Sequence, residues 1–233
     1  IAEDSGFDYM LIPVDGACWE AYITGAFVAA STNKISSLIA ARPGYVNPVL
    51  LAKMISTFDR MSGGRVCVNL IAGQVDEELK SEGISYSKEE RYAMMDEEVT
   101  IMKSLWAGEG PVDFDGCFHQ ISGASVNPKP SGQPRFYLGG GSAAAWELSA
   151  KHSDVHLFWG DMPERIAENI AKLRVLAAIH GRENDLGFGM RLQIICRERE
   201  SEALGAAEDL IHHIPEAMRD RLKVRVAQSE ANQ

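Results

Sequence analysis

The segment 35–73 constrains the fold of this chain more than any other part of the sequence. A short apolar run, Ile35–Ala41, is followed by Arg-Pro-Gly, and a second run, Val66–Ala72, is followed by glycine. Between the runs, Pro48 stands where the first turn of a helix tolerates proline, and apolar residues follow a helical period up to Ser62. The pattern predicts a strand–helix–strand unit, and a crossover of this length joins parallel strands that are buried on both faces.

The same alternation recurs along the chain. Apolar runs predict strands at 9–13, 35–41, 66–72, 136–138, 155–159 and 188–196. Helical patterns follow them at 19–31, 48–62, 143–152, 163–180 and 201–213. Segment 74–133 is polar and rich in glycine and proline, and we interpret it as an insertion with a helix at 89–105 and a small hairpin around Phe114 and Ile121. Residues 216–233 predict a frayed helix or a loop.

Six strand–helix units in constant order fit either a doubly wound open sheet or a (β/α)8 barrel. The sequence G-x-G-x-x-G does not follow the first predicted strand, which disfavours a dinucleotide-binding fold. A complete barrel usually needs roughly 250 residues, and residues 1–5 resemble the tail of a helix that starts upstream. We therefore expect one α/β domain, residues 1–233, that forms a (β/α)8 barrel lacking its first and last strands.

The composition of the chain argues against several classes of binding partner. The formal charge is −10, from 23 basic and 33 acidic residues, which argues against a nucleic-acid or anionic-membrane surface. The four cysteines form no C-x-x-C pair and the six histidines show no metal-ligand spacing, so we expect neither a disulfide framework nor a metal site. Free thiols, with no signal peptide and no apolar run of membrane-spanning length, favour the cytoplasm.

In a barrel, functional residues lie where strands end and loops begin. The turn from Gly139 to Ser142 joins a predicted strand to a predicted helix, where bare amides could hold a phosphate, although a tight turn alone would also require glycine. Arg42 and Arg191 adjoin or interrupt apolar runs, so each must form an ion pair or face a ligand. Cys18 is either an active-site thiol or a small buried hydrophobic residue.

Seven segments, in the same order along the chain, resemble the bacterial luciferase-like flavin monooxygenases, most closely the alkanesulfonate monooxygenase branch. These segments are LIPVDGACWE, ARPG, DRMSGGRVCVNLIAG, EERY, YLGGGS, LFWGD and GMRLQIICRE. The resemblance implies a luciferase-like (β/α)8 TIM barrel, reduced FMN supplied by a separate NAD(P)H-dependent FMN reductase, and a dimer or tetramer. It also implies that O2 oxygenates a small organosulfur substrate, with an alkanesulfonate giving an aldehyde and sulfite.

By matching position, the resemblance also assigns residues. The residues Ala72, Gly73, Tyr92, Gly140, Gly141 and Ser142 would hold FMN, with the last three at its phosphate. Cys18 would lie near the flavin and stabilise its oxygenated form, and Arg191 would orient the sulfonate.

Gln193 is a departure from the alkanesulfonate branch, which has histidine at this position, and we count it as the third catalytic residue. Glutamine hydrogen-bonds but does not exchange a proton near neutral pH. A different small substrate such as a sulfone, a deazaflavin cofactor, or a flavin-binding barrel without catalysis therefore remain alternatives.

Overall fold

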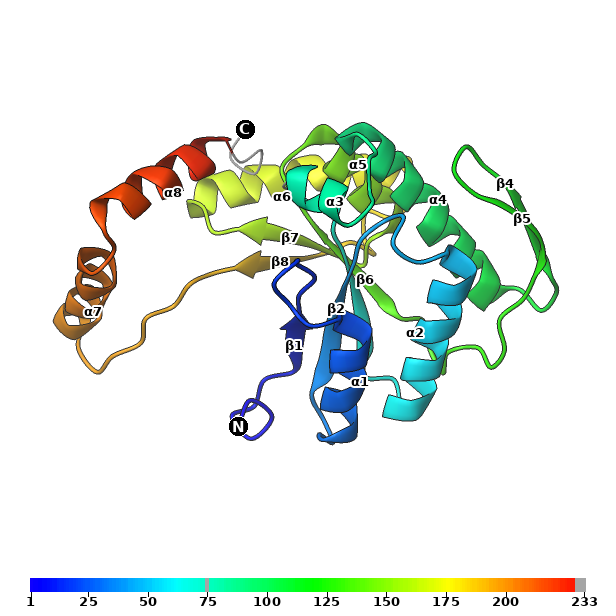
Figure 1. Ribbon diagram of the computed structural model, residues 1–233, viewed down its shortest axis with the longest axis horizontal. Coiled ribbons are helices and arrows are strands. Elements are labelled where there is room, and N and C mark those ends of the chain that lie inside the picture. Colours follow the sequence, from blue (N-terminus) through cyan, green and yellow to red (C-terminus); the bar gives the residue numbers. More distant parts are fainter. Residues whose placement is uncertain (74–75, 229–233) are drawn as a thin grey trace.

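The computed structural model describes residues 1–73 and 76–228. Six parallel strands form a curled sheet (Figure 1) in the order β1 (Tyr9–Ile12), β2 (Ser36–Ala41), β3 (Val66–Leu70), β6 (Arg135–Gly139), β7 (Val155–Trp159) and β8 (Gly187–Arg191). Spatial order follows chain order, as in a (β/α)8 barrel. Within the described residues the sheet has two edges, β1 and β8. The prediction of an incomplete α/β barrel is therefore confirmed.

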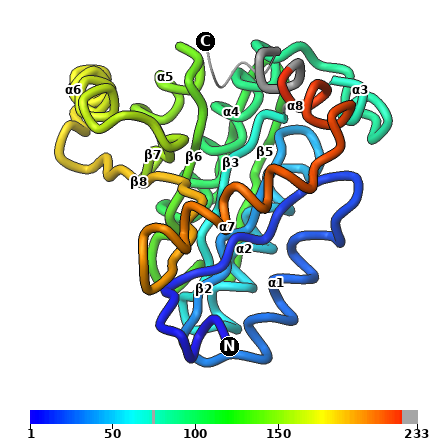
Figure 2. The backbone as a smooth tube through the Cα atoms, turned by 90° about the vertical axis from the view of Figure 1, so that its left-hand side faces the viewer, coloured from blue at the N-terminus to red at the C-terminus, as the bar shows by residue number. Residues whose placement is uncertain are grey.

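The crossover helices line up side by side along the sheet. They are α1 (Ala21–Ala30), α2 (Pro48–Ser62), α4 (Lys88–Ala107), α5 (Ala143–His152) and α6 (Pro163–Ile179), and each contacts the next. The core lies between these helices and the strands, where Ile39, Val68 and Phe136 are fully buried. Trp106 of α4 stacks on Phe136 with ring centres 5.8 Å apart. The tube view shows the same layer of helices around the strands (Figure 2).

Local signals set the ends of α2 as the sequence predicts. The side chain of Asn47 accepts a hydrogen bond from the backbone of Val49 at 3.0 Å, and Pro48 fills the first helical position. Gly63, with a φ of 70°, ends the helix in the left-handed conformation. The helix therefore spans the predicted residues 48–62.

The connection from β3 to β6 holds the short helix α3 (Asp76–Ser81), then α4, then the hairpin of β4 (Val112–Asp115) and β5 (Gln120–Ala124). The helix and hairpin predicted here are present, whereas α3 was not predicted. The Glu97 carboxylate accepts hydrogen bonds from the backbone amides of three consecutive residues, 117–119, at 2.6, 3.0 and 3.0 Å. A β-carbon on Gly116 would lie 2.5 Å from Glu97, so the hairpin needs glycine there.

The last predicted strand, 188–196, is too long. Strand β8 ends at Arg191, which pairs with Trp159, the last residue of β7. An extended segment then leads to α7 (Glu200–His212) and α8 (Glu216–Gln228), which stand away from the sheet (Figure 1). The frayed helix or loop expected at 216–233 is helical through 228, and 229–233 lie outside the described residues. Among the helices that are described, none is both long and apolar enough to cross a bilayer.

Candidate functional site

The carboxyl ends of the six parallel strands lie at one edge of the sheet, because parallel strands share a direction. The loops at this edge carry every residue that the sequence predicted for the site except Tyr92, which lies on α4, and Arg191, which is the last residue of β8. The predicted residues therefore belong to one side of the molecule, although they come from separate loops.

Gly140 and Tyr92 meet at the start of α5. Gly140 has a φ of 142°, and a β-carbon there would lie 3.0 Å from the β-carbon of Ala145 and 3.5 Å from the hydroxyl of Tyr92. Glycine therefore allows α4 and the first turn of α5 to approach each other here without crowding Ala145. The indole Nε1 of Trp146 donates to the carbonyl of Gly140 at 3.1 Å and fixes this turn, a contact that sequence reasoning missed.

The amino-terminal end of α5 has the character of an anion site. Ser142 is its N-cap, with the hydroxyl accepting a hydrogen bond from the amide of Ala145 at 3.3 Å. The first turn begins with Ala143 and Ala144, both exposed, whose small side chains leave their backbone amides approachable. Free amides and the helix dipole both favour a negative group at such a position. Of the predicted phosphate ligands 140–142, Gly140 lies beside Tyr92 and Ser142 caps α5.

Ala72 and Gly73 follow β3 and are packed under α3. Ala72 is buried, and Gly73 adopts a φ of 87°. The side chain of Leu79, buried in α3, reaches within 2.7 Å of the place where a β-carbon on Gly73 would stand. The position of α3 therefore determines the shape of this predicted flavin contact.

Arg191 is exposed, so the sequence interpretation that placed it inside a buried strand is wrong. It ends β8, and its guanidinium carbon lies 4.7 Å from the centre of the Trp159 ring, a cation–π contact. The carbonyl of Arg191 accepts a hydrogen bond from the amide of Gly160 at 3.1 Å. Gln193 lies two residues beyond, exposed in the extended segment after β8. The structure thus places a positive charge and an aromatic ring together at the sheet edge.

Cys18 is exposed in the loop after β1, which corrects the reading of it as a buried hydrophobic residue. Asp15 shapes this loop: its side chain accepts a hydrogen bond from the amide of Ala17 at 3.0 Å, and its carbonyl accepts one from the amide of Cys18 at 2.9 Å. Cys18 follows β1 and Arg191 ends β8, so these two predicted catalytic residues come from opposite ends of the strand order.

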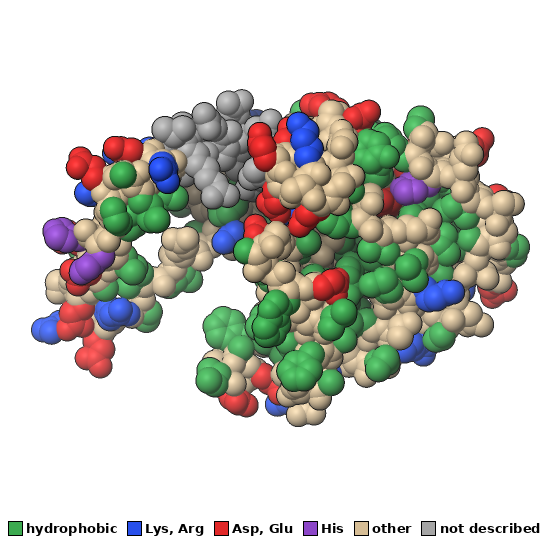
Figure 3. Space-filling model, in the orientation of Figure 1, with side chains coloured by type: hydrophobic (Ala, Val, Ile, Leu, Met, Phe, Trp, Pro, Cys, Tyr) green, Lys and Arg blue, Asp and Glu red, His purple; other side chains and the backbone are tan. Residues whose placement is uncertain are grey.

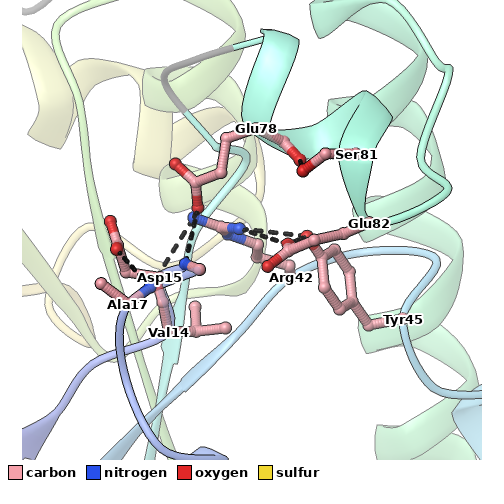
Figure 4. A network of polar contacts seen from close by, with 9 residues as sticks. Val14, Asp15, Ala17, Arg42, Tyr45, Glu78, Ser81 and Glu82 are labelled. Atoms are coloured by element: carbon pink, nitrogen blue, oxygen red, sulfur yellow. Dashed lines mark hydrogen bonds and ion pairs between the residues drawn. The ribbon is translucent and has the colours of Figure 1, made fainter.

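Of the two roles predicted for Arg42, an ion pair or a ligand contact, the structure shows an ion pair (Figure 4). Its side chain, only 6% exposed, lies 2.7 Å from the carboxylate of Glu78 and 3.0 Å from that of Glu82. Both glutamates lie at or just after α3, one helical turn apart. That i, i+4 acidic pair was the sequence signal for this network, and the prediction from sequence did not use it.

Burial also changes the pKa of Tyr45, the tyrosine of this network. The pKa of Tyr45 is raised, first by burial and then by its hydrogen bond to Glu82. The phenol therefore stays protonated and serves as a donor to the carboxylate. Across the described residues, no group of three or more His, Cys, Asp or Glu side chains is arranged to hold a metal ion.

Comparisons with known proteins agree with this architecture. The family model described as luciferase-like monooxygenase matches residues 1–233. Among solved structures, EDTA monooxygenase (EmoA) from Chelativorans sp. BNC1 has a TM-score of 0.83 and 15% identity, over 96% of this chain and 60% of that chain. Riboflavin lyase (RcaE), solved with modified FMN and riboflavin, has a TM-score of 0.80 and 19% identity, over 89% and 56%.

An F420-dependent secondary alcohol dehydrogenase, in complex with an F420–acetone adduct, has a TM-score of 0.70 and 24% identity, over 81% of this chain and 61% of that chain. The chain thus spans 56–61% of the length of these three structures. The structural likenesses establish the fold, and the family model covers the entire sequence. The chain therefore belongs to the luciferase-like monooxygenases.

Proposed function

We propose that this chain is part of a two-component monooxygenase that uses reduced FMN and O2 to oxygenate a small organosulfur compound. An alkanesulfonate is the first candidate, with an aldehyde and sulfite as products. The observation that carries the proposal is the amino-terminal turn of α5, where Gly140, the hydroxyl of Tyr92 and the N-cap Ser142 come together. Backbone amides and the helix dipole at such a turn favour a negative group, which suits the phosphate of FMN.

The residues present fit this cofactor. A phosphate beside Gly140 would accept hydrogen bonds from the hydroxyl of Tyr92 and from backbone amides at the start of α5, and Ser142 would add a hydroxyl. Ala72 and Gly73 would line the flavin from the end of β3. FMN, when bound in its reduced state, supplies the reactivity toward O2 that protein side chains lack. A separate NAD(P)H-dependent FMN reductase is the proposed source of the reduced cofactor.

Arg191 supports the choice of an anionic substrate. It is exposed at the sheet edge, and no carboxylate whose side chain is described lies within ion-pair distance of it. A guanidinium held on Trp159 can therefore pair with a sulfonate through two parallel hydrogen bonds. Gln193 would add a neutral hydrogen-bonding group, and Cys18 would approach the flavin from the loop after β1.

Two alternatives have support. Similarity to an F420-dependent enzyme favours a deazaflavin as the rival cofactor. Gln193, where the alkanesulfonate branch has histidine, favours a sulfone-like substrate or a barrel that binds flavin without turnover. We also propose that the functional unit is a dimer or tetramer, which sedimentation velocity would measure directly.

An anaerobic fluorescence titration with reduced FMN, oxidised FMN and F420 tests the proposal. We expect micromolar or tighter affinity for reduced FMN and weaker affinity for the other two. A screen of alkanesulfonates and sulfones with FMN, an FMN reductase, NADH and O2 would then give sulfite from the sulfonates. Preference for F420 or for oxidised FMN would support the corresponding alternative, and binding of neither flavin would reject the cofactor assignment.

A further inference from the structure

We propose that Arg42 is a positioning residue that fixes the Cys18 loop, residues 14–18, against helix α3. It thereby sets where the thiol stands relative to Ala72 and Gly73. The inference rests on the proposed function only in treating these residues as neighbours of a flavin. The contacts of Arg42 themselves are features of the protein alone.

Arg42 lies at the carboxyl end of β2, which is paired with β1 on one side and β3 on the other. Its guanidinium is therefore placed between the loops that follow those two strands. One nitrogen, Nη2, donates both to the carbonyl of Val14 at 3.2 Å and to Glu78 at 2.7 Å. The other, Nη1, donates to Glu82 at 3.0 Å and to the hydroxyl of Tyr45 at 3.0 Å.

Glu78 contacts both sides of this junction. The same oxygen that pairs with Arg42 accepts a hydrogen bond from the amide of Gly16 at 3.3 Å (Figure 4 shows the surrounding network). The Cys18 loop is thus held to α3 through Arg42 and through Glu78 directly. From Gly16 the turn shaped by Asp15 leads within two residues to the thiol.

Helix α3 also restrains Gly73, the predicted flavin contact that follows β3. Leu79, the residue after Glu78, is 1% exposed and packs on Gly73. Fixing Glu78 therefore also fixes the side chain that covers Gly73. Arg42 is the common partner of the two segments that we expect to flank the flavin.

The charges explain why a neutral side chain would not replace Arg42. Two carboxylates, with side chains 22% and 28% exposed, share one guanidinium, and Tyr45 donates a further hydrogen bond to Glu82. Removing the guanidinium would leave two partly buried carboxylates facing each other without compensation. We expect the loop and α3 to separate in response.

Arg42→Met tests this directly, with Arg65→Met as the matched control. Arg65 is also a partly buried guanidinium that joins segments, donating to the carbonyls of Ala29 and Ile35 at 2.8 and 2.9 Å. It lies before β3, at the amino-terminal end of the sheet. Arg65→Met therefore removes a similar set of hydrogen bonds from a partly buried guanidinium, but at the opposite end of the strands from the Cys18 loop.

The first readout is hydrogen exchange of flavin-free protein, resolved by peptide. For Arg42→Met we expect exchange in 14–18 and 76–82 to accelerate at least tenfold, and for Arg65→Met no change there. Wild-type exchange in 14–18 of folded Arg42→Met would overturn the proposal. Should that variant not fold, Arg42→Lys takes its place, because lysine keeps the positive charge but lacks the planar fork that reaches Val14, Glu78 and Glu82 together; faster exchange is expected in 14–18, and wild-type exchange again overturns the proposal.

The second readout is alkylation of Cys18 with and without saturating FMN, with Cys117 and Cys196 as internal references. In wild type and Arg65→Met we expect FMN to slow alkylation of Cys18 several-fold. In Arg42→Met we expect most of this protection to be lost, and full protection would overturn the positioning role. If FMN protects Cys18 in none of the proteins and binds none of them, the proposed function fails, while the exchange result still decides the role of Arg42 in the loop.

Discussion

A β-carbon on Gly140 would lie 3.5 Å from the hydroxyl of Tyr92, so α4 and the turn before α5 approach each other closely at these two residues. The two residues belong to different strand–helix units. A ligand group that fits there would contact both units at once, and substitutions on either side should therefore weaken its binding in different ways.

Gly140→Ala should weaken FMN binding about tenfold or more. The new methyl group would stand 3.0 Å from Ala145, and the φ of 142° is one that side chains disfavour, at a cost on the order of 1–3 kcal/mol. Fluorescence titration measures the affinity. Gly132→Ala is the control, because a β-carbon there meets nothing within 4 Å. Equal affinity in both variants would remove Gly140 from the site.

Tyr92→Phe removes only the hydroxyl. It therefore tests a contact with the phosphate of FMN separately from contacts with the flavin ring system. A hydrogen bond to a charged group contributes roughly 1.5–3 kcal/mol, so FMN affinity should fall about tenfold or more. Binding of riboflavin, which has no phosphate, should not change. Parallel titrations with the two ligands check this, and an equal loss for both would contradict a phosphate contact.

Arg191→Ala should abolish turnover of an anionic substrate and leave FMN affinity and the thermal midpoint near wild type. The matched control is Arg174→Ala, since Arg174 also makes a cation–π contact, 5.8 Å from the ring of Phe188 in the same strand β8. Steady-state kinetics with a sulfonate would show the difference. Activity in Arg191→Ala equal to that of the control would exclude Arg191 from substrate recognition.

Stability should fall in mild acid because of His156. Burial lowers the pKa of this fully buried imidazole from 6.5 to about 4. The unfolded chain binds a proton near pH 6.5 whereas the folded chain does not until about pH 4. The associated stability is thus complete above pH 6.5 and is lost as the pH falls toward 4, up to about 3 kcal/mol.

Urea unfolding at pH 7 and pH 4.5 measures this loss. His156→Gln keeps a polar side chain for the hydroxyl of Ser149, which lies 2.9 Å from Nδ1, but removes the titrating group. The variant should lose less stability than wild type between the two pH values. His213→Gln, in an exposed position, should behave as wild type, and identical pH dependence in all three proteins would contradict the assignment.

Local signals explain why much of the fold was predictable. The unit from β2 to β3 combines continuous apolar runs, a proline at the first helical position and a terminating glycine, and all of these act within a few residues. The strand that ends at Arg191 was harder. Residues 192–196 remain mostly apolar, but β7 stops at Trp159, so the extended segment has no strand partner among the described residues. Such an end depends on the neighbouring strand and not on its own sequence.

The candidate site also contains residues that the sequence predicted and residues that it did not. Glycines 140 and 141 and the N-cap Ser142 were predictable because a strand-to-helix turn demands such residues. The partners of Arg42 were missed, because Glu78 and Glu82 lie 36 and 40 residues away, in and just after a short helix that has only one buried side chain, Leu79. The spacing of the two glutamates indicates a pair on one helical face, but it does not indicate which arginine they contact.

The carboxylate of Glu97 fixes the turn of the β4–β5 hairpin to helix α4. Hydrophobic side chains are spread over the visible face of the molecule (Figure 3), whereas the turn of this hairpin is held by polar contacts with two carboxylates of α4, Glu97 and Glu98, the latter 3.3 Å from His119. Phe118 also contacts the ring of Tyr86, and apolar residues of both strands pack against the core. Protein engineers who exchange loops between related barrels therefore have a natural cassette at 112–124. Its replacement requires that Glu97, Glu98 and Gly116 be kept and that the new strands present apolar residues to the core.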